Sequence, residues 1–270
     1  MAQVQAGVTE ECEPSPESQR LIIALCLLLL AGLSWAWLVE QATYVRSAAT
    51  AMAAMPGMPA TAAPQVWTYI PASALTWFLM MVAMMLPSAA PLVFLYGRFN
   101  LASRSPIKST LVIVSVYLAI WAGFSVTAAV AQYLLVRFGV ASEATLAIGD
   151  RRLGGMLLIL AGLYQFSKLK SVCLDACRSP LSFVIRLWRP GWRGAANIGA
   201  HHGLHCLGCN WLLMGLLFVG GVMNLTWVVG LAFLVLIEKT APHGQRLAQA
   251  AGVVALVWGV VLMMSSALVR

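Results

Sequence analysis

Residues 21–39 read LIIALCLLLLAGLSWAWLV and contain no charged side chain. A helix needs about 20 apolar residues to cross the hydrocarbon core of a bilayer, so this segment predicts a transmembrane helix. Residues 1–19 contain four Glu and no Lys or Arg, unlike the basic start of a signal peptide. We therefore expect residues 1–20 to be a polar tail that precedes a retained anchor.

The rest of the chain continues this apolar pattern. Hydrophobic residues make up 61% and charged residues 10% of the composition, and the mean hydropathy is +0.85. Six further runs have the length and composition of membrane spans, at residues 73–96, 109–135, 153–166, 199–222, 225–237 and 248–268. The sequence thus predicts an all-α, polytopic transmembrane bundle over residues 21–270 with about seven spans, or six if Trp211–Ile237 forms one long helix.

The distribution of Lys and Arg predicts the orientation of this bundle. With seven spans and a cytoplasmic N-terminus, 12 basic residues fall inside and five outside, as the positive-inside rule requires. A basic, Cys-containing linker at residues 167–204 would then face the cytoplasm, and a polar, Met-rich loop at residues 40–72 would face outward. The net charge of +8 is explained by orientation in the lipid bilayer, so we expect no nucleic-acid partner and a multi-pass protein of the bacterial inner membrane.

Two neighbouring motifs carry soft metal ligands. Residues 170–180 read KSVCLDACRSP, and residues 200–214 read AHHGLHCLGCNWLLM. Thiolate and imidazole bind soft and borderline metal ions, which makes the candidate ligands Cys173, Cys177, His201, His202, His205, Cys206 and Cys209. We expect the two motifs to dock together in one site. The alternatives are a structural zinc that pins the linker to the helix, and buried thiols without a metal.

On one helix, these histidines and cysteines divide between two faces. His201, His205 and Cys209 recur on one face, and His202, Cys206 and Cys209 on another. Helical spacing alone leaves open which face holds a metal.

Methionines form a second candidate element. Residues 77–87 read WFLMMVAMMLP, and helical spacing brings Met80, Met81, Met84 and Met85 into one stripe. Thioethers favour Cu(I), although Met also fills gaps between helices. Pro87 and Pro91 predict a kink or break here. The segment MAAMPGM, residues 52–58, is a candidate capture element in the outer loop or, alternatively, a low-complexity linker.

Acidic groups are scarce. The chain has nine Asp and Glu in total, and four of them lie in the N-terminal tail. Glu238 ends an apolar run, where it is either an interfacial residue paired with a cation or an intramembrane functional carboxylate. The sequence lacks the serine-hydrolase, P-loop and zinc-protease motifs, so we expect no catalytic residues and favour a protein that is not an enzyme.

From Trp77 to its end the chain resembles a family of bacterial predicted metal-binding integral membrane proteins. The resemblance rests on WFLMMVAMMLPSAAP, YQFSKLKSVCLDACRSP, HGLHCLGCNWLLM and the Glu238-Lys239 pair. It implies metal binding at Cys173, Cys177, His202, Cys206 and Cys209, and it implies no reaction. The family pattern more often reads C-x-G-C-C-W, and here Asn210 takes the place of the third cysteine.

These features favour a membrane protein that transports or delivers Cu(I), with copper as the first candidate metal and zinc as the second. Outer methionines would capture the ion, the methionine stripe would pass it on, and the inner cysteines and histidines would receive it. A metallochaperone or a larger membrane complex would be its partner. Two alternatives stay open: a membrane thiol–disulfide oxidoreductase, and a non-catalytic subunit or assembly factor with a structural metal.

Overall fold

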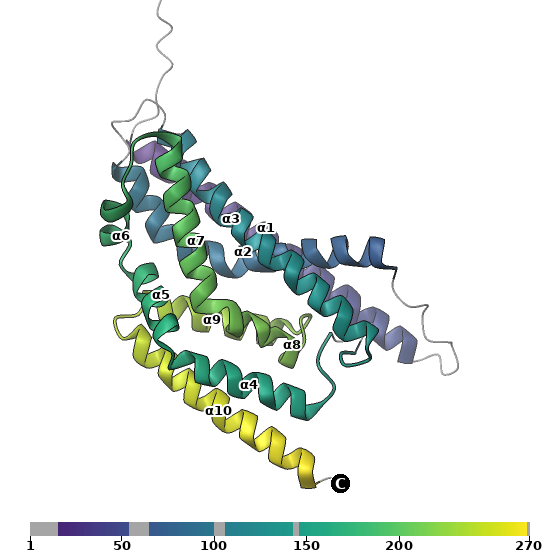
Figure 1. Ribbon diagram of the computed structural model, residues 1–270. Coiled ribbons are helices and arrows are strands. Elements are labelled where there is room, and N and C mark those ends of the chain that lie inside the picture. The colour runs from purple at the N-terminus through teal and green to yellow at the C-terminus, as the bar shows by residue number, and fades with distance from the viewer. Residues whose placement is uncertain (1–15, 54–64, 100–105, 143–145, 269–270) are drawn as a thin grey trace, which may run out of the picture.

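The described part of the chain is built from α-helices (Figure 1). The computed structural model describes residues 16–53, 65–99, 106–142 and 146–268. Within these ranges the helices are α1 (Pro16–Ala53), α2 (Val66–Phe99), α3 (Pro106–Arg137), α4 (Arg151–Gln165), α5 (Lys168–Arg178), α6 (Pro180–Leu187), α7 (Gly191–Gly215), α8 (Leu217–Gly220), α9 (Leu225–Thr240) and α10 (Gly244–Leu268). The all-helical prediction is confirmed for these residues.

Five helical segments are long and apolar enough to cross a membrane: α1, α2, α3, α7 with α8, and α10. The number rises to six if α4 and α5, which meet at an angle of 63°, form one bent span. The count of seven is not confirmed, because α4 has 15 residues and α9 has 16. These lengths fall short of the roughly 20 residues that a full crossing takes.

The prediction of one helix over Trp211–Ile237 is wrong, because the chain turns between α8 and α9. Gly221 adopts a φ of 90°, a value that glycine reaches without the clash of a Cβ atom. Asn224 then begins α9, where its Oδ1 accepts a hydrogen bond from the backbone N–H of Trp227 at 3.4 Å.

The predicted loop at residues 40–72 is shorter than expected, since α1 continues to Ala53 and α2 already begins at Val66. Met55 and Met58 lie outside the described residues, and Met52 is described by its backbone alone. The segment predicted as a linker, residues 167–204, consists mainly of helices. Ser167 caps α5 by accepting a hydrogen bond from the Lys170 N–H, and Pro180 begins α6, a position where its missing N–H costs little.

α2 lies at the centre of the molecule. In its most apolar 18-residue window 61% of residues are buried, against 22% in α1 and 17% in α10. It packs against α1, α3, α6 and α9, which explains why the whole run from Met80 to Leu86 is buried. Pro71, Pro87 and Pro91 lie inside α2, yet it remains one helix. Of the predicted kink or break, the break is therefore absent, and the kink stays a prediction.

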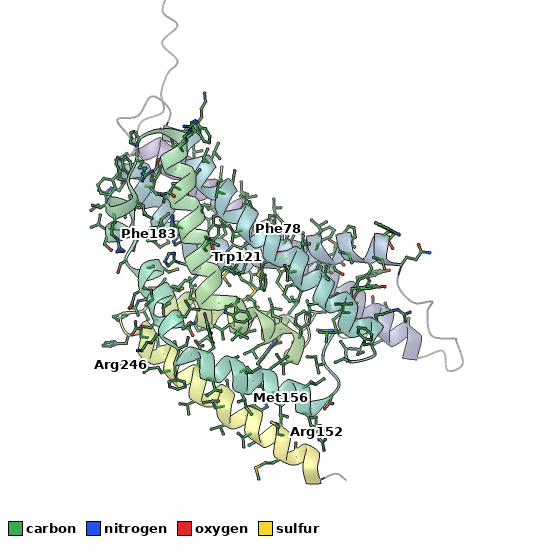
Figure 2. The ribbon with its side chains drawn as sticks, viewed as in Figure 1. Phe78, Trp121, Arg152, Met156, Phe183 and Arg246 are labelled. Atoms are coloured by element: carbon green, nitrogen blue, oxygen red, sulfur yellow. The ribbon has the colours of Figure 1, made fainter. Side chains whose placement is uncertain are left out.

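The helices α4 and α10 form a separate antiparallel pair along one edge of the molecule (Figure 1). Arg152 and Arg246, which lie near their N-terminal ends, sit at opposite ends of this pair (Figure 2). Two glycine contacts allow close packing: a Cβ on Gly155 would lie 2.8 Å from the Gly259 carbonyl oxygen, and one on Gly162 would lie 2.8 Å from that of Gly252.

Candidate metal centre

The two cysteine motifs meet where α5 packs on α7. Gly208 permits this contact, because a Cβ atom there would lie 2.8 Å from the Cys173 sulfur. The Tyr164 hydroxyl of α4 donates a hydrogen bond to the Gly208 carbonyl and adds a third helix to the contact. The predicted docking of the two motifs is therefore confirmed.

Three thiols converge at this contact. Cys206 and Cys209 on α7 are fully buried, and Cys177 on α5 packs against the core clusters that contain them. The Cys209 sulfur also lies 3.3 Å from the Cys206 carbonyl oxygen, to which it donates. Cys173 packs beside Cys209 in the same small apolar cluster. Cys177, Cys206 and Cys209 are called the thiol cluster below.

The thiol cluster lies deeper along its helix than expected. We predicted that the fifth helix begins near Gly199, which would put the motif at its entrance. Instead α7 begins at Gly191, 15 residues before Cys206, which corresponds to about 22 Å of helix at 1.5 Å per residue. The cysteines are thus interior residues of α7.

Cys206 has polar partners from two other helices. Its sulfur lies 3.1 Å from the Tyr117 hydroxyl of α3 and 3.0 Å from the Lys239 ammonium nitrogen of α9. The Tyr117 hydroxyl also donates to the Met85 carbonyl oxygen at 3.1 Å. The same ammonium donates to the Ser88 hydroxyl at 3.0 Å. A single thiol of α7 therefore connects α2, α3 and α9.

The three histidines of α7 lie on two different faces of the helix, one buried and one accessible. His202 is buried and stacks on Tyr117, with ring centroids 5.6 Å apart. Neither of its ring nitrogens has a hydrogen-bond partner among the described residues. His201 is exposed, and the Nδ1 of the half-buried His205 lies 2.6 Å from the His201 carbonyl oxygen. The buried face is therefore that of His202, Cys206 and Cys209.

The methionine stripe faces the interior. Met80, Met81, Met84 and Met85 are each at most 2% exposed. They belong to the same core cluster as Cys206 and Tyr117. The four thioethers and Cys206 are thus parts of one buried core cluster.

A buried ion pair, which our sequence analysis did not predict, lies behind the thiol cluster. The Lys170 ammonium of α5 is 2.6 Å from a carboxylate oxygen of Glu238 on α9, and both side chains are 1% exposed. Gln165 donates to the other carboxylate oxygen at 3.1 Å, and Lys170 also donates to the Cys209 carbonyl at 2.8 Å. Glu238 is thus buried and paired with a cation, which is Lys170 and not the neighbouring Lys239.

Two sequence signals pointed to this arrangement. Glu238 and Lys239 end an apolar run, and Lys170 precedes Cys173 by one turn of helix. The sequence did not indicate which partner either lysine contacts. Asn210, at the position of a third cysteine, donates to the Cys206 carbonyl at 2.8 Å and to the Cys209 sulfur at 3.2 Å.

The donor chemistry of this region suits a soft ion. Thiolates and thioethers favour Cu(I), and the unpaired ring of His202 is one turn from Cys206. Among the described residues, however, no three His, Cys, Asp or Glu side chains are placed to hold a metal ion as they stand. A centre with two sulfur ligands needs no such group of three.

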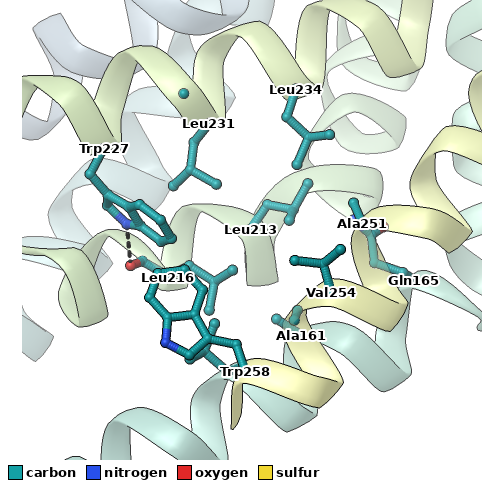
Figure 3. A pocket seen from close by; sticks show the side chains of 13 residues that line it. Ala161, Gln165, Leu213, Leu216, Trp227, Leu231, Leu234, Ala251, Val254 and Trp258 are labelled. Carbon is teal, nitrogen blue, oxygen red and sulfur yellow. Dashed lines mark hydrogen bonds between the residues drawn. The ribbon is translucent and has the colours of Figure 1, made fainter. Parts of the chain in front are cut away.

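An apolar cavity of about 260 Å³ lies between α4, α7, α9 and α10 (Figure 3). Leucines, alanines and the rings of Trp227 and Trp258 line it, and the Trp227 indole N–H donates to the Leu216 carbonyl at 2.8 Å. Gln165 lines the cavity and donates a hydrogen bond to Glu238, so it connects the cavity to the buried ion pair. The lining contains no Cys, His or Met, so this cavity is not the candidate metal site.

Comparison with known proteins identifies the family. Residues 74–262 match the model of the PpoB2 family, described as copper chaperone. The chain belongs to this copper chaperone family. The matched residues include the methionine stripe, both cysteine motifs and the buried ion pair. No curated protein and no solved structure matches the chain.

Proposed function

We propose that this copper chaperone family member is an integral protein of the bacterial inner membrane that receives Cu(I) and transports or delivers it. The observation that carries the proposal is the thiol cluster, in which Cys206 and Cys209 are buried and Cys177 packs against the core that holds the methionine stripe. Copper is the ion that is carried, and the thiol cluster is the site that binds it most tightly. The chain binds and passes on the ion and performs no reaction on it.

The route that we propose runs from the methionines to the cysteines. Met80, Met81, Met84 and Met85 offer neutral thioethers, which bind Cu(I) weakly enough to release it. Thiolates bind it more tightly, so the ion moves downhill from thioether to thiolate. The Tyr117 hydroxyl touches both the Met85 backbone and the Cys206 sulfur, which supports a route that ends at Cys206. His202 would complete the ligand set, whereas His201, His205 and Cys173 lie at its margin.

We further propose a cytoplasmic N-terminus, from the Lys and Arg distribution. The thiol cluster is too buried to report topology by direct labelling, so reporter cysteines at exposed arginines are more informative. In a chain without its native cysteines, Arg189→Cys should resist a membrane-impermeant thiol reagent added outside intact cells, and Arg151→Cys should react. The reverse pattern would invert the orientation. A soluble metallochaperone on the thiol side, or a larger membrane complex, is the proposed partner.

The central experiment is metal analysis of the purified full-length protein under anaerobic conditions. The wild-type protein should bind Cu(I) in competition with a Cu(I) chelator, and Cys206→Ser/Cys209→Ser should lose this binding. Cys26→Ser removes an exposed cysteine of α1 and serves as the matched control with unchanged affinity. Equal Cu(I) affinity in the wild type and the double variant would contradict the proposal.

The two alternative functions make different predictions. A thiol–disulfide oxidoreductase would show a defined reduction potential and turnover with a dithiol substrate, and a subunit with a structural metal would hold zinc without exchange. All cysteines that the structure describes are free thiols, and no contact in the described part of the chain favours either alternative over copper handling.

A further inference from the structure

We propose that Lys239 is the counter-cation of the loaded copper centre and that its single charge selects a monovalent soft ion over a divalent one. This inference rests on the proposed function, because it concerns the charge of the same thiol cluster when it holds its cargo. It adds a specificity-determining residue that is not itself a ligand.

Lys239 is a buried cation whose charge is not balanced by a carboxylate. Its side chain is 8% exposed, and its ammonium contacts the Ser88 hydroxyl and the Cys206 sulfur, each at 3.0 Å. The one ion pair within the described ranges joins Lys170 to Glu238. Glu238, the residue before Lys239 on α9, thus neutralises Lys170 and not Lys239. Buried charges persist in proteins when they are paired, so the partner of Lys239 must be the sulfur centre.

Charge balance then decides which complex fits. Cu(I) bound by two thiolates carries a net charge of −1, and one ammonium makes the buried assembly neutral. Zn(II) bound by the same two thiolates is already neutral, so Lys239 would remain as an uncompensated buried charge. Two sulfur ligands suffice for Cu(I), and this number agrees with the absence of a ready group of three ligands among the described residues.

The same count assigns roles within the thiol cluster. Cys206 touches Lys239 directly and supplies one thiolate. The second comes from Cys177 or Cys209, both of which lie in the cluster. In this count the other groups that face the centre are neutral: the third cysteine as a thiol, the Tyr117 hydroxyl, the Asn210 amide and the imidazole of His202. Lys239 is therefore the group that sets the sign of the field at Cys206.

The test compares two partners of one sulfur atom. Lys239→Met removes the charge at 3.0 Å from Cys206, and Tyr117→Phe removes a neutral hydroxyl at 3.1 Å. Affinities of the purified full-length proteins for Cu(I) and for Zn(II) are measured anaerobically with chelators as competitors. Lys239→Met should weaken Cu(I) binding about 30-fold, the effect of one charge-assisted contact. Tyr117→Phe should weaken it about fivefold.

The decisive readout is that the two metals respond in opposite directions. In Lys239→Met the affinity for Zn(II) should rise while that for Cu(I) falls, and Lys239→Arg should restore the wild-type preference. General structural damage would lower both affinities. Parallel falls, or an unchanged preference in Lys239→Met, would overturn the proposal.

A further variant keeps the test open if Lys239→Met does not accumulate. Lys239→Gln retains a donor for Ser88 and Cys206 without the charge, and it should show the same opposite shifts. The two hypotheses fail separately. Wild-type protein that binds no Cu(I) would refute the proposed function and this inference together, whereas Cu(I) binding that is indifferent to the charge at residue 239 would refute this inference alone.

Discussion

The region around α2, α7 and α9 and the α4–α10 pair are held together by different means. In the first region, sulfur atoms, a buried ion pair and a buried cation lie among helices that enclose them. In the second, backbone contacts at Gly155 and Gly259 bring two helices close, and Val254 and Val257 of α10 remain exposed. Buried charge occurs where neighbouring helices supply its partners. The enclosed region is therefore suited to metal handling, and the pair is suited to contact lipid.

The largest effect on stability is expected from a substitution in the enclosed region. Glu238→Gln leaves the Lys170 ammonium buried without its counter-charge, and we expect the free energy of unfolding to fall by about 3–5 kcal/mol. Denaturation in mixed micelles measures this change. The double variant Lys170→Met/Glu238→Gln removes both charges and should recover most of the loss. A single variant as stable as the wild type would show that this pair is not a structural element.

A smaller effect is expected in the glycine pair. Gly259→Ala places a Cβ atom 2.7 Å from the Gly155 carbonyl oxygen, and such overpacking should cost about 1–3 kcal/mol. Because the thiol cluster lies elsewhere, the Cu(I) affinity should not change. Gly123→Ala, where a Cβ atom meets nothing within 4 Å, is the matched control and should be neutral or slightly stabilising. A loss of Cu(I) affinity in Gly259→Ala would mean that the two regions are coupled.

The smallest effect on stability per substituted residue is expected at the methionine stripe. Replacement of Met80, Met81, Met84 and Met85 by Leu nearly conserves volume and should cost less than about 1.5 kcal/mol per site. Copper delivery, measured as Cu(I) transfer across membrane vesicles, should nevertheless fall because Leu offers no sulfur lone pair. Met156→Leu/Met264→Leu, at exposed positions of α4 and α10, should leave delivery unchanged. Equal copper delivery by both variants would show that the methionine stripe serves only to pack the core.

The sequence predicted the helices better than their connections. Runs such as residues 21–39 and 109–135 have the composition of membrane helices, and α1 and α3 contain them. Helices that depend on tertiary contacts were missed: α5 is polar and basic, and its buried residues Lys170, Cys173 and Leu174 pack against other elements. The Ser167 cap is the one local signal noted for this helix, and its basic residues led us to interpret the segment as a linker.

For the candidate site, the sequence indicated which residues could be ligands but not which residues contact one another. The motifs singled out Cys177, Cys206 and Cys209, and in the structure Cys177 packs against the clusters that hold the other two. Helical spacing left two histidine faces open, and only packing against Tyr117 shows that His202 is on the buried one. The partners of Lys170 and Lys239 are 68 and 33 residues away in the chain, a separation that no local pattern encodes.

The adjacency of Glu238 and Lys239 also fixes how α9 is turned about its own axis. Consecutive side chains leave an α-helix about 100° apart, so one points to Lys170 and the other to Cys206. A rotation of α9 by about 100° in one direction would bring the Lys239 ammonium toward the Lys170 ammonium, and the same rotation in the other direction would bring the Glu238 carboxylate toward Cys206. The first contact is repulsive, and the second leaves both lysines without their present partners. The rest of this helix is largely apolar and discriminates weakly between rotations. Two neighbouring charges of opposite sign thus give α9 one angular setting.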